Sequence, residues 1–378
     1  MKKKIIVVGL LPLNEAYKKR LFMYEFEKSK IEYEYWSLYY IFYKNEPVVY
    51  DRIIQKNEKI FKTKLELLNE IERISTDFIF IKEGEIEKEI IDFYLKFFKK
   101  KIKIIFLKWG STPQIEGKDL LKKRLKQLLN IKKVILQINF LFKYQKLNCL
   151  SNYNEKNIKI LYAGKKFKDG MLKNKRIEKI AVMSEDLENY LKLKEIGKKE
   201  NQVVFLDQNL PNHPDFDIVG EKKINSEKYY KQLNNFFDYI EKVFNTKVII
   251  AAHPKSNYLP ETFGGRKIVK NQTATEIKKS KLILASYSTT TGLGIVENKP
   301  IILIENNDFS EFMKSKVKKI AEVLDVIIIN MDVFDYKLPE LNINKEKYKK
   351  YYNEYLGDGI NLKSAKDSIL EFINGDKL

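Results

Sequence analysis

The chain has a single cysteine, Cys149, and only two histidines among its 378 residues. One cysteine excludes an intramolecular disulfide and a zinc site built from several thiolates, and it favours a reducing compartment. No segment approaches the roughly 20 uninterrupted apolar residues of a membrane-spanning helix. The apolar run near the start is broken by Pro12, Asn14 and Glu15, which predicts a first β-strand and not a signal peptide. We therefore expect a cytoplasmic protein.

Several common functional motifs are also missing. The chain has no P-loop, no GxGxxG after its first predicted strand, no GxSxG elbow and no HExxH helix. Their absence excludes the usual nucleoside triphosphatases, dehydrogenases, serine hydrolases and zinc proteases. There is also no zinc finger, no RNP motif and no obvious helix-turn-helix. We therefore predict no nucleic-acid partner, in spite of the basic composition.

What the chain does have is an excess of positive charge. It contains 71 Lys and Arg against 51 Asp and Glu, a formal net charge of +20. Lysine is abundant throughout, and solvated helix faces are one interpretation of basic stretches such as 99–101 and 122–124. The other is attraction to anionic lipid headgroups, to which each basic side chain contributes on the order of 1 kcal/mol. We predict an anionic membrane surface as a partner and a peripheral location at the inner face of the cell membrane.

Short β-branched runs alternate with longer helical patterns, which is typical of α/β proteins with parallel sheets. A first series of strands is predicted at 4–8, 31–36, 78–81, 102–106 and 158–162. A second series is predicted at 180–183, 202–206, 247–251, 281–285, 300–304 and 326–329. Helical patterns separate these strands, including one at 120–129.

The length suits two domains of roughly 150–200 residues each. We expect one over residues 1–170, a second over 177–340, and terminal helices over 341–378 that pack across both. The polar stretch 164–176 is the predicted linker. The stretch 134–144 is apolar on too many sides for a surface helix, so it is either buried or a docking face. Two open sheets of this kind bind ligands at the carboxyl ends of their strands.

The most distinctive motif, His253-Pro254-Lys255, follows one of these predicted strands. Histidine changes charge near neutral pH and donates hydrogen bonds to phosphate, and a lysine adds a compact positive charge. An ordinary surface histidine in a loop is the alternative. We interpret His253 as a phosphate-binding group and proton donor, with Pro254 and Lys255 in the same binding turn.

A cluster of hydroxyl side chains follows the next predicted strand and precedes a helix that begins with small residues. Hydroxyl donors and the free amides of a helix start form an anion site. Capping of the helix is the alternative, but capping needs only one such residue. We predict that Ser286, Ser288, Thr289 and Thr290 bind a phosphate or a carboxylate.

Two further positions are candidates. Asp207 follows the buried strand 202–206, where partial desolvation raises a carboxyl pKa towards that of a useful base; an aspartate that accepts backbone amides in a turn is the alternative. Gly264-Gly265-Arg266 allows a close backbone approach and offers an arginine to an anion. A simple turn explains that triplet equally well. We include Asp207 as a catalytic candidate and Gly265 as a donor-binding candidate.

The His253-Pro254 pair, the hydroxyl cluster and Asp207 together resemble the bacterial sialyltransferases and the related capsular Kdo transferases. The likeness covers roughly residues 180–310. It implies a GT-B fold, in which two Rossmann-like domains face a central cleft, and a CMP-activated acidic sugar as the donor. It also implies that His253 contacts the CMP phosphate as general acid, and that the hydroxyl cluster holds the phosphate or the sugar carboxylate.

One element of the resemblance is incomplete. The family pattern includes two acidic residues followed by glycine, and Glu83-Gly84-Glu85 matches it only in part. The base that deprotonates the acceptor is therefore either Asp207 or Glu83. The DxD triplet at 215–217, which some glycosyltransferases use to bind a metal and a nucleotide, is too short a pattern to predict a metal site.

We therefore expect a metal-independent glycosyltransferase. It would transfer sialic acid, another nonulosonate or Kdo from the CMP form to a glycan or glycolipid acceptor of the capsule or lipooligosaccharide. One alternative keeps the fold and changes the donor to a UDP- or GDP-sugar or to CDP-glycerol. Another is a non-catalytic relative that binds glycans or membranes.

Overall fold

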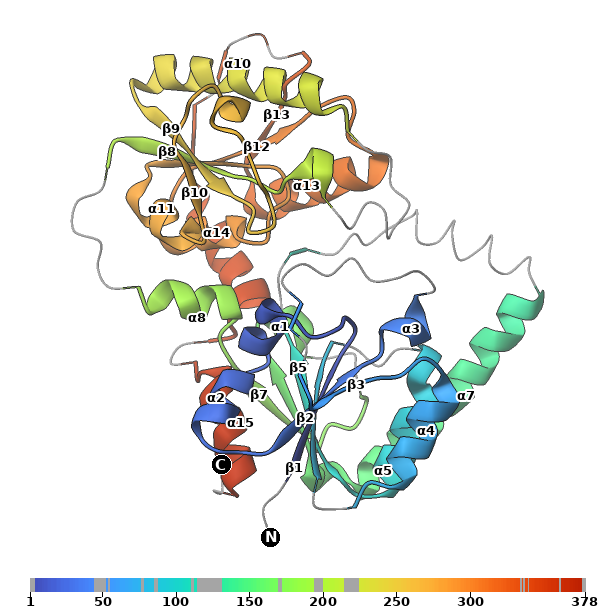
Figure 1. The fold of residues 1–378 in the computed structure, drawn as a ribbon. Helices are drawn as coiled ribbons and strands as arrows, with labels where there is room; N and C mark the ends of the chain where they lie inside the picture. Colours follow the sequence, from blue (N-terminus) through green and yellow to red (C-terminus); the bar gives the residue numbers. More distant parts are fainter. Residues whose placement is uncertain are drawn as a thin grey trace. The chain divides into compact units, whose positions relative to one another are not determined.

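The chain forms two compact α/β units. The computed structural model describes residues 4–43, 52–53, 55–75, 78–84, 88–109, 112–113, 131–168, 172–193, 200–213, 224–333, 335, 337–338, 340–359 and 362–375. Unit 1 comprises Met1–Gly110, Glu116–Met183 and Gly357–Leu378, and unit 2 comprises Ser111–Ile115 and Ser184–Leu356. Each unit contains one parallel sheet (Figure 1), so the predicted two-domain α/β class is confirmed. The helix expected at 120–129 and the triplet at 215–217 lie outside the described residues.

Unit 1 is built on seven parallel strands in the order β3-β2-β1-β4-β5-β6-β7. They are β1 (Lys4–Gly9), β2 (Tyr33–Ser37), β3 (Glu58–Ile60), β4 (Phe78–Glu83), β5 (Lys103–Lys108), β6 (Ile158–Tyr162) and β7 (Glu178–Ala181). β-Branched and aromatic residues dominate these strands because both faces of the sheet are covered by helices. Strand β3 was not predicted, because three residues are too few to show a pattern.

Two layers of helices cover this sheet (Figure 1). One face packs against α3 (Tyr39–Phe42), α4 (Lys64–Glu72), α5 (Ile91–Lys99) and α7 (Ile131–Tyr153). The other packs against α1 (Glu15–Arg20), α2 (Met23–Lys28) and α15 (Ala365–Asn374). Short helical turns are η1 (Lys88–Ile90), η2 (Glu155–Asn157) and η3 (Lys165–Phe167).

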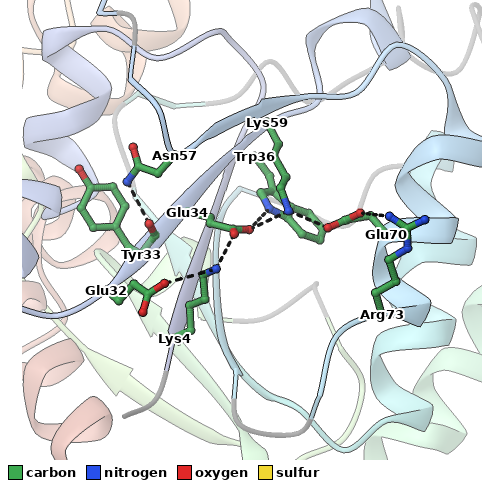
Figure 2. A network of polar contacts seen from close by, with 9 residues as sticks. All are labelled: Lys4, Glu32, Tyr33, Glu34, Trp36, Asn57, Lys59, Glu70 and Arg73. Atoms are coloured by element: carbon green, nitrogen blue, oxygen red, sulfur yellow. Dashed lines mark hydrogen bonds and ion pairs between the residues drawn. The ribbon is translucent and has the colours of Figure 1, made fainter.

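A chain of charged side chains ties three strands of this sheet to α4 (Figure 2). Lys4 Nζ lies 2.5 Å from Glu34 Oε1, and Lys59 Nζ lies 3.2 Å from Glu34 Oε2 and 2.6 Å from Glu70 Oε1. Burial raises the pKa of Glu34, but hydrogen bonds from Lys4 and Trp36 and the nearby Lys59 charge leave it below its ordinary value. The carboxylate form of Glu34 therefore stabilises the folded unit.

Unit 2 is built on six parallel strands in the order β10-β9-β8-β11-β12-β13. They are β8 (Gln202–Leu206), β9 (Lys247–Ala252), β10 (Ile268–Lys270), β11 (Leu282–Ala285), β12 (Ile301–Glu305) and β13 (Ile327–Asn330). Its helices are α8 (Glu185–Leu191), α10 (Ser226–Phe244), α11 (Thr273–Lys279), α12 (Thr291–Val296), α13 (Glu311–Leu324) and α14 (Lys345–Tyr351). Shorter turns are η4 (Leu210–Asn212), η5 (Pro260–Phe263) and η6 (Tyr352–Leu356).

The boundary between the units falls after Met183, later than the predicted linker at 164–176. The strand expected to open the second sheet is β7, which instead pairs with β6 through Leu161 and Ile180. The last helices do not form one element: α14 and η6 belong to unit 2, whereas α15 belongs to unit 1. A β-rich run does not indicate which sheet it will join, and for this reason the strand was assigned to the wrong unit.

Candidate active site

The candidate site lies at the carboxyl edge of the sheet in unit 2. Strand β8 is central, and the chain continues to β9 on one side of it and to β11 on the other. Leu206 at the end of β8 is level with Ala251 of β9 and with Ala285 of β11. The residues that follow these three strands therefore emerge side by side. A reversal of strand order of this kind is where open α/β sheets bind ligands.

His253 opens a tight turn at the end of β9. Its carbonyl oxygen accepts hydrogen bonds from the backbone nitrogen of Ser256 at 2.9 Å and from the Ser256 hydroxyl at 2.7 Å. Pro254 occupies the second position of this turn, where its fixed φ is favourable. Pro254 and Lys255 are exposed. The proline thus fixes the turn that presents His253 at the edge of the sheet.

The imidazole of His253 is oriented by its own turn. The backbone nitrogen of Lys255 donates to His253 Nδ1 at 3.2 Å. A nitrogen that accepts a hydrogen bond cannot carry the proton, so the neutral ring is protonated at Nε2. The ring of His213, directly after η4, lies edge-on to it with the centroids 5.3 Å apart. The two histidines of the chain are therefore neighbours, each half-buried.

Asp207 anchors the turn that begins at His253. Its side chain is only 6% exposed, and its Oδ2 accepts from the backbone nitrogen of His253 at 3.0 Å and from Tyr258 Oη at 2.7 Å. Its Oδ1 accepts from the backbone nitrogen of Asn209 at 2.9 Å. The pKa of Asp207 lies above its ordinary value, because the effect of burial outweighs the lowering effect of these hydrogen bonds. Both carboxylate oxygens are engaged, and this geometry favours a positioning role.

The neighbouring residue Gln208 holds the hydroxyl cluster. Its Oε1 accepts a hydrogen bond from the backbone nitrogen of Tyr287 at 2.9 Å. Asp207 and Gln208, adjacent in sequence at the end of β8, therefore bond to the turn after β9 and to the turn after β11. This pair of residues joins the two predicted binding turns.

The hydroxyl cluster divides into buried and accessible groups. Ser286 and Thr291 are 1% and 0% exposed, and neither side-chain oxygen has a hydrogen-bond partner among the described residues. Ser288 and Thr290 are half-buried, with their hydroxyl oxygens 2.8 Å apart, and Thr289 is exposed. The accessible hydroxyls are therefore those of Ser288, Thr289 and Thr290, while that of Ser286 is buried.

The helix after this cluster is short and closely packed. Helix α12 has six residues and a buried start. A Cβ atom at Gly294 would lie 2.2 Å from Ile283 Cδ1 of β11, so a side chain at this position would displace that of Ile283. The small residues that suggested a binding helix therefore serve packing against the sheet.

Gly265 is not brought to this site. Strand β10 is parallel to β9 and begins with Ile268 beside Ile250, so Gly265, three residues earlier, lies towards the amino end of β9. His253 lies beyond the carboxyl end of the same strand. Gly265 has a φ of +75°, which a glycine adopts without strain in a turn. The prediction that Gly265 belongs to the donor site is corrected: it lies at the opposite edge of the sheet.

Arg266, which accompanies that glycine, is held by α10. Its Nη2 lies 2.8 Å from Glu241 Oε2, and it also pairs with Asp238. Its Nη1 donates to Asn234 Oδ1 at 3.1 Å. The side chain is 8% exposed. Through these contacts Arg266 links the turn at Gly264 and Gly265 to α10.

The sequence interpretation missed two side chains that the structure adds to the site, Gln208 and Tyr258. His213 is the second of the two histidines, and its position beside His253 follows from the fold. Glu83, the other candidate base, ends β4 in unit 1, and its side chain lies outside what the structure describes.

No family model and no curated protein matches this chain. Among solved structures it is similar to the wall teichoic acid polymerase TagF, with 13% identity, a TM-score of 0.48 and coverage of 100% of this chain and 89% of that one. It is also similar to CalG4, the calicheamicin glycosyltransferase, with 11% identity, a TM-score of 0.47 and coverage of 99% and 94%. A UDP-GlcNAc 2-epimerase from Methanocaldococcus jannaschii follows, with 14% identity, a TM-score of 0.45 and coverage of 98% and 99%.

Proposed function

We propose that this protein is a glycosyltransferase that transfers an acidic sugar, such as sialic acid, another nonulosonate or Kdo, from a CMP-activated donor to a cell-surface glycan acceptor. The observation that supports it is the placement of His253 and the hydroxyls of Ser288, Thr289 and Thr290 on adjacent turns at the switch point of one sheet. Phosphate is the group that an imidazole and several hydroxyl hydrogen-bond donors bind best. The domain class and the sequence resemblance agree with this proposal.

His253 would act on the leaving phosphate. In the neutral ring the proton is on Nε2, because Nδ1 accepts from Lys255. When the bond between the sugar and the phosphate oxygen breaks, the electron pair remains on that oxygen. The Nε2–H of the neutral ring donates a hydrogen bond to it, and a proton is transferred only from the imidazolium form, which becomes neutral imidazole. The Lys255 ammonium and the neighbouring His213 would add positive charge beside the same phosphate.

The hydroxyl cluster would hold the remaining anionic oxygens. Ser288, Thr289 and Thr290 offer donors at the surface of the turn, and they lie close to His253 because Asp207 and Gln208 are adjacent. No step of this scheme requires a metal ion, so the donor is proposed to react without one.

The acceptor hydroxyl must lose its proton to a base. Asp207 has a raised pKa, as a base requires, but its oxygens are occupied by the turn that they support. We therefore assign Asp207 to positioning.

Calorimetric titration with CMP, UDP and CDP-glycerol tests the donor class. We expect CMP to bind most tightly. Tighter binding of UDP or CDP-glycerol assigns the protein to the alternative donor class, and no response from folded protein to any of the three contradicts the proposal.

Turnover of CMP-sialic acid and CMP-Kdo, followed by release of CMP, tests the reaction. His253→Ala should lower the rate by about 10²-fold or more, the contribution of one general acid. Leu259→Ser is the matched control, since Leu259 lies in the same connection and is 65% exposed. Nucleotide binding without turnover, and without an effect of His253→Ala, supports a non-catalytic relative instead.

A further inference from the structure

Helix α7 of unit 1 presents an apolar face to solvent. The exposed side chains are Ile135 (52%), Leu136 (68%), Ile138 (46%), Leu141 (54%) and Phe142 (68%). Among the described residues, these five make up a large share of the thirteen exposed large hydrophobic side chains, and they lie within eight consecutive positions. Single exposed apolar residues are ordinary, but a contiguous apolar patch marks an interaction surface. This stretch is part of the segment predicted to be either buried or a docking face.

The opposite side of α7 accounts for the attachment of the helix to its unit. Leu147 is fully buried, and Phe140, Tyr144 and Leu150 pack against the same core. Lys143 pairs with Asp92 of α5 at 2.7 Å. The outward side chains of α7 therefore take no part in this attachment.

The charge around this face indicates which partner. Helix α7 contains no acidic residue. The helix sequence contains Lys132, Lys133, Lys143 and Lys146, and positions 118–130 before it carry five further Lys or Arg and one Asp. A second copy would bring the same excess of positive charge, because the net charge of the chain is +20. A partner that is anionic at its surface and apolar beneath suits both the exposed apolar side chains and the basic residues. An anionic lipid bilayer has this structure.

We propose that the outward face of α7, defined by Ile135, Ile138, Leu141 and Phe142, inserts into the interfacial layer of an anionic membrane. The side chains at 135, 138 and 142 share one helix face, and such helices bury their apolar side by about 5–10 Å in the headgroup region. None of the described helices is long and apolar enough to cross a membrane. This inference concerns unit 1 alone and does not depend on the donor proposed for unit 2.

The sole cysteine is a natural probe of this surface. Cys149 is exposed and lies on α7 seven residues, or about two turns, after Phe142. The full-length protein is labelled there with an environment-sensitive fluorophore and mixed with vesicles of phosphatidylcholine alone or with 30% phosphatidylglycerol. We expect a blue shift with the anionic vesicles, little shift with the neutral ones, and a weaker shift at high salt. An equal response to both vesicle types, or no response, contradicts the proposal.

Co-flotation of the full-length protein with the same vesicles tests the apolar residues. The double variant Ile138→Ser, Phe142→Ser should lower the affinity for anionic vesicles by about tenfold or more. The matched control is the double variant Leu65→Ser, Leu259→Ser, which also removes two exposed apolar side chains and should bind like the unaltered protein. Equal binding of both double variants overturns the proposal, provided that their unfolding midpoints agree. So does sedimentation of the unaltered protein as a dimer that Ile138→Ser, Phe142→Ser dissociates, since a second copy would then cover the face.

Discussion

The substitution Asp207→Asn separates a positioning role from a catalytic one, because asparagine keeps the size of the side chain and removes its charge. In the folded protein, Oδ2 accepts from the His253 amide and the Tyr258 hydroxyl, and Oδ1 accepts from the Asn209 amide. Asparagine has only one acceptor oxygen, and its other terminal atom is a donor. Whichever way the amide is turned, at least one backbone N–H therefore faces an NH₂ group.

The magnitude follows from the number of donors left without a partner. One buried N–H that loses its acceptor costs about 1–3 kcal/mol, so Asp207→Asn should lower the free energy of unfolding by about this amount. The Tyr258 hydroxyl can instead donate to Asn209 Oδ1, 3.2 Å away, so it keeps a hydrogen-bond acceptor. Asp207→Ala orphans both backbone amides and should cost about twice as much. That is a large part of the roughly 5–15 kcal/mol that holds a domain folded, so the asparagine variant is the more informative one.

Urea unfolding and calorimetric titration with CMP are measured on the same protein preparations. A positioning role predicts lower stability and weaker nucleotide binding together, because the turn that carries His253 loses its anchor. A catalytic base predicts unchanged nucleotide binding, with turnover reduced by about 10²-fold or more, since the lost hydrogen bonds lower the stability in either case. The second result would refute the positioning role of Asp207.

Three further predictions concern contacts elsewhere. Gln208→Leu removes the acceptor of the Tyr287 amide and should lower the free energy of unfolding by about 1–3 kcal/mol, whereas Gln208→Glu retains an acceptor; urea unfolding compares them, and equal values would contradict the link. The lowered pKa of Glu34 means that its stabilisation is present above the ordinary value of 4.5 and is lost as pH falls through the folded value, so the difference in melting temperature between the unaltered protein and Glu34→Gln should shrink on acidification. Arg266→Lys should cost about 1–3 kcal/mol and leave CMP affinity unchanged, because Arg266 lies away from the site.

Much of the second sheet could be predicted from the sequence. The strand expected at 202–206 coincides with β8, and that expected at 247–251 differs from β9 by one residue. Buried parallel strands are continuous runs of β-branched and aromatic residues, and the polar residues that follow them mark their ends. Because every strand in such a sheet points the same way, residues after strand ends could be expected on one edge, as Asp207, His253 and Ser286 are.

Other features depend on partners far away in the sequence. Arg266 was a candidate anion ligand, but Asp238 and Glu241 of α10, a helix of about five turns, pair with its guanidinium. The displacement of Gly265 to the opposite edge follows from the return of the chain through η5 before β10 begins. His213 lies 40 positions before His253, and nothing in the local pattern indicates that their rings meet. Such contacts are set by tertiary packing, which composition and periodicity do not encode.

The arrangement at the end of β8 also explains why the two turns are best regarded as one site. Consecutive residues of a strand point to opposite sides, so where β8 ends, two adjacent side chains are available for two different neighbours. Asp207 accepts a hydrogen bond from the turn after β9, and Gln208 accepts one from the turn after β11. The two turns are therefore anchored by two consecutive residues. The imidazole and the hydroxyls are consequently held at a fixed separation before any ligand binds, and such preorganisation is what a site needs in order to stabilise charge that develops during a reaction.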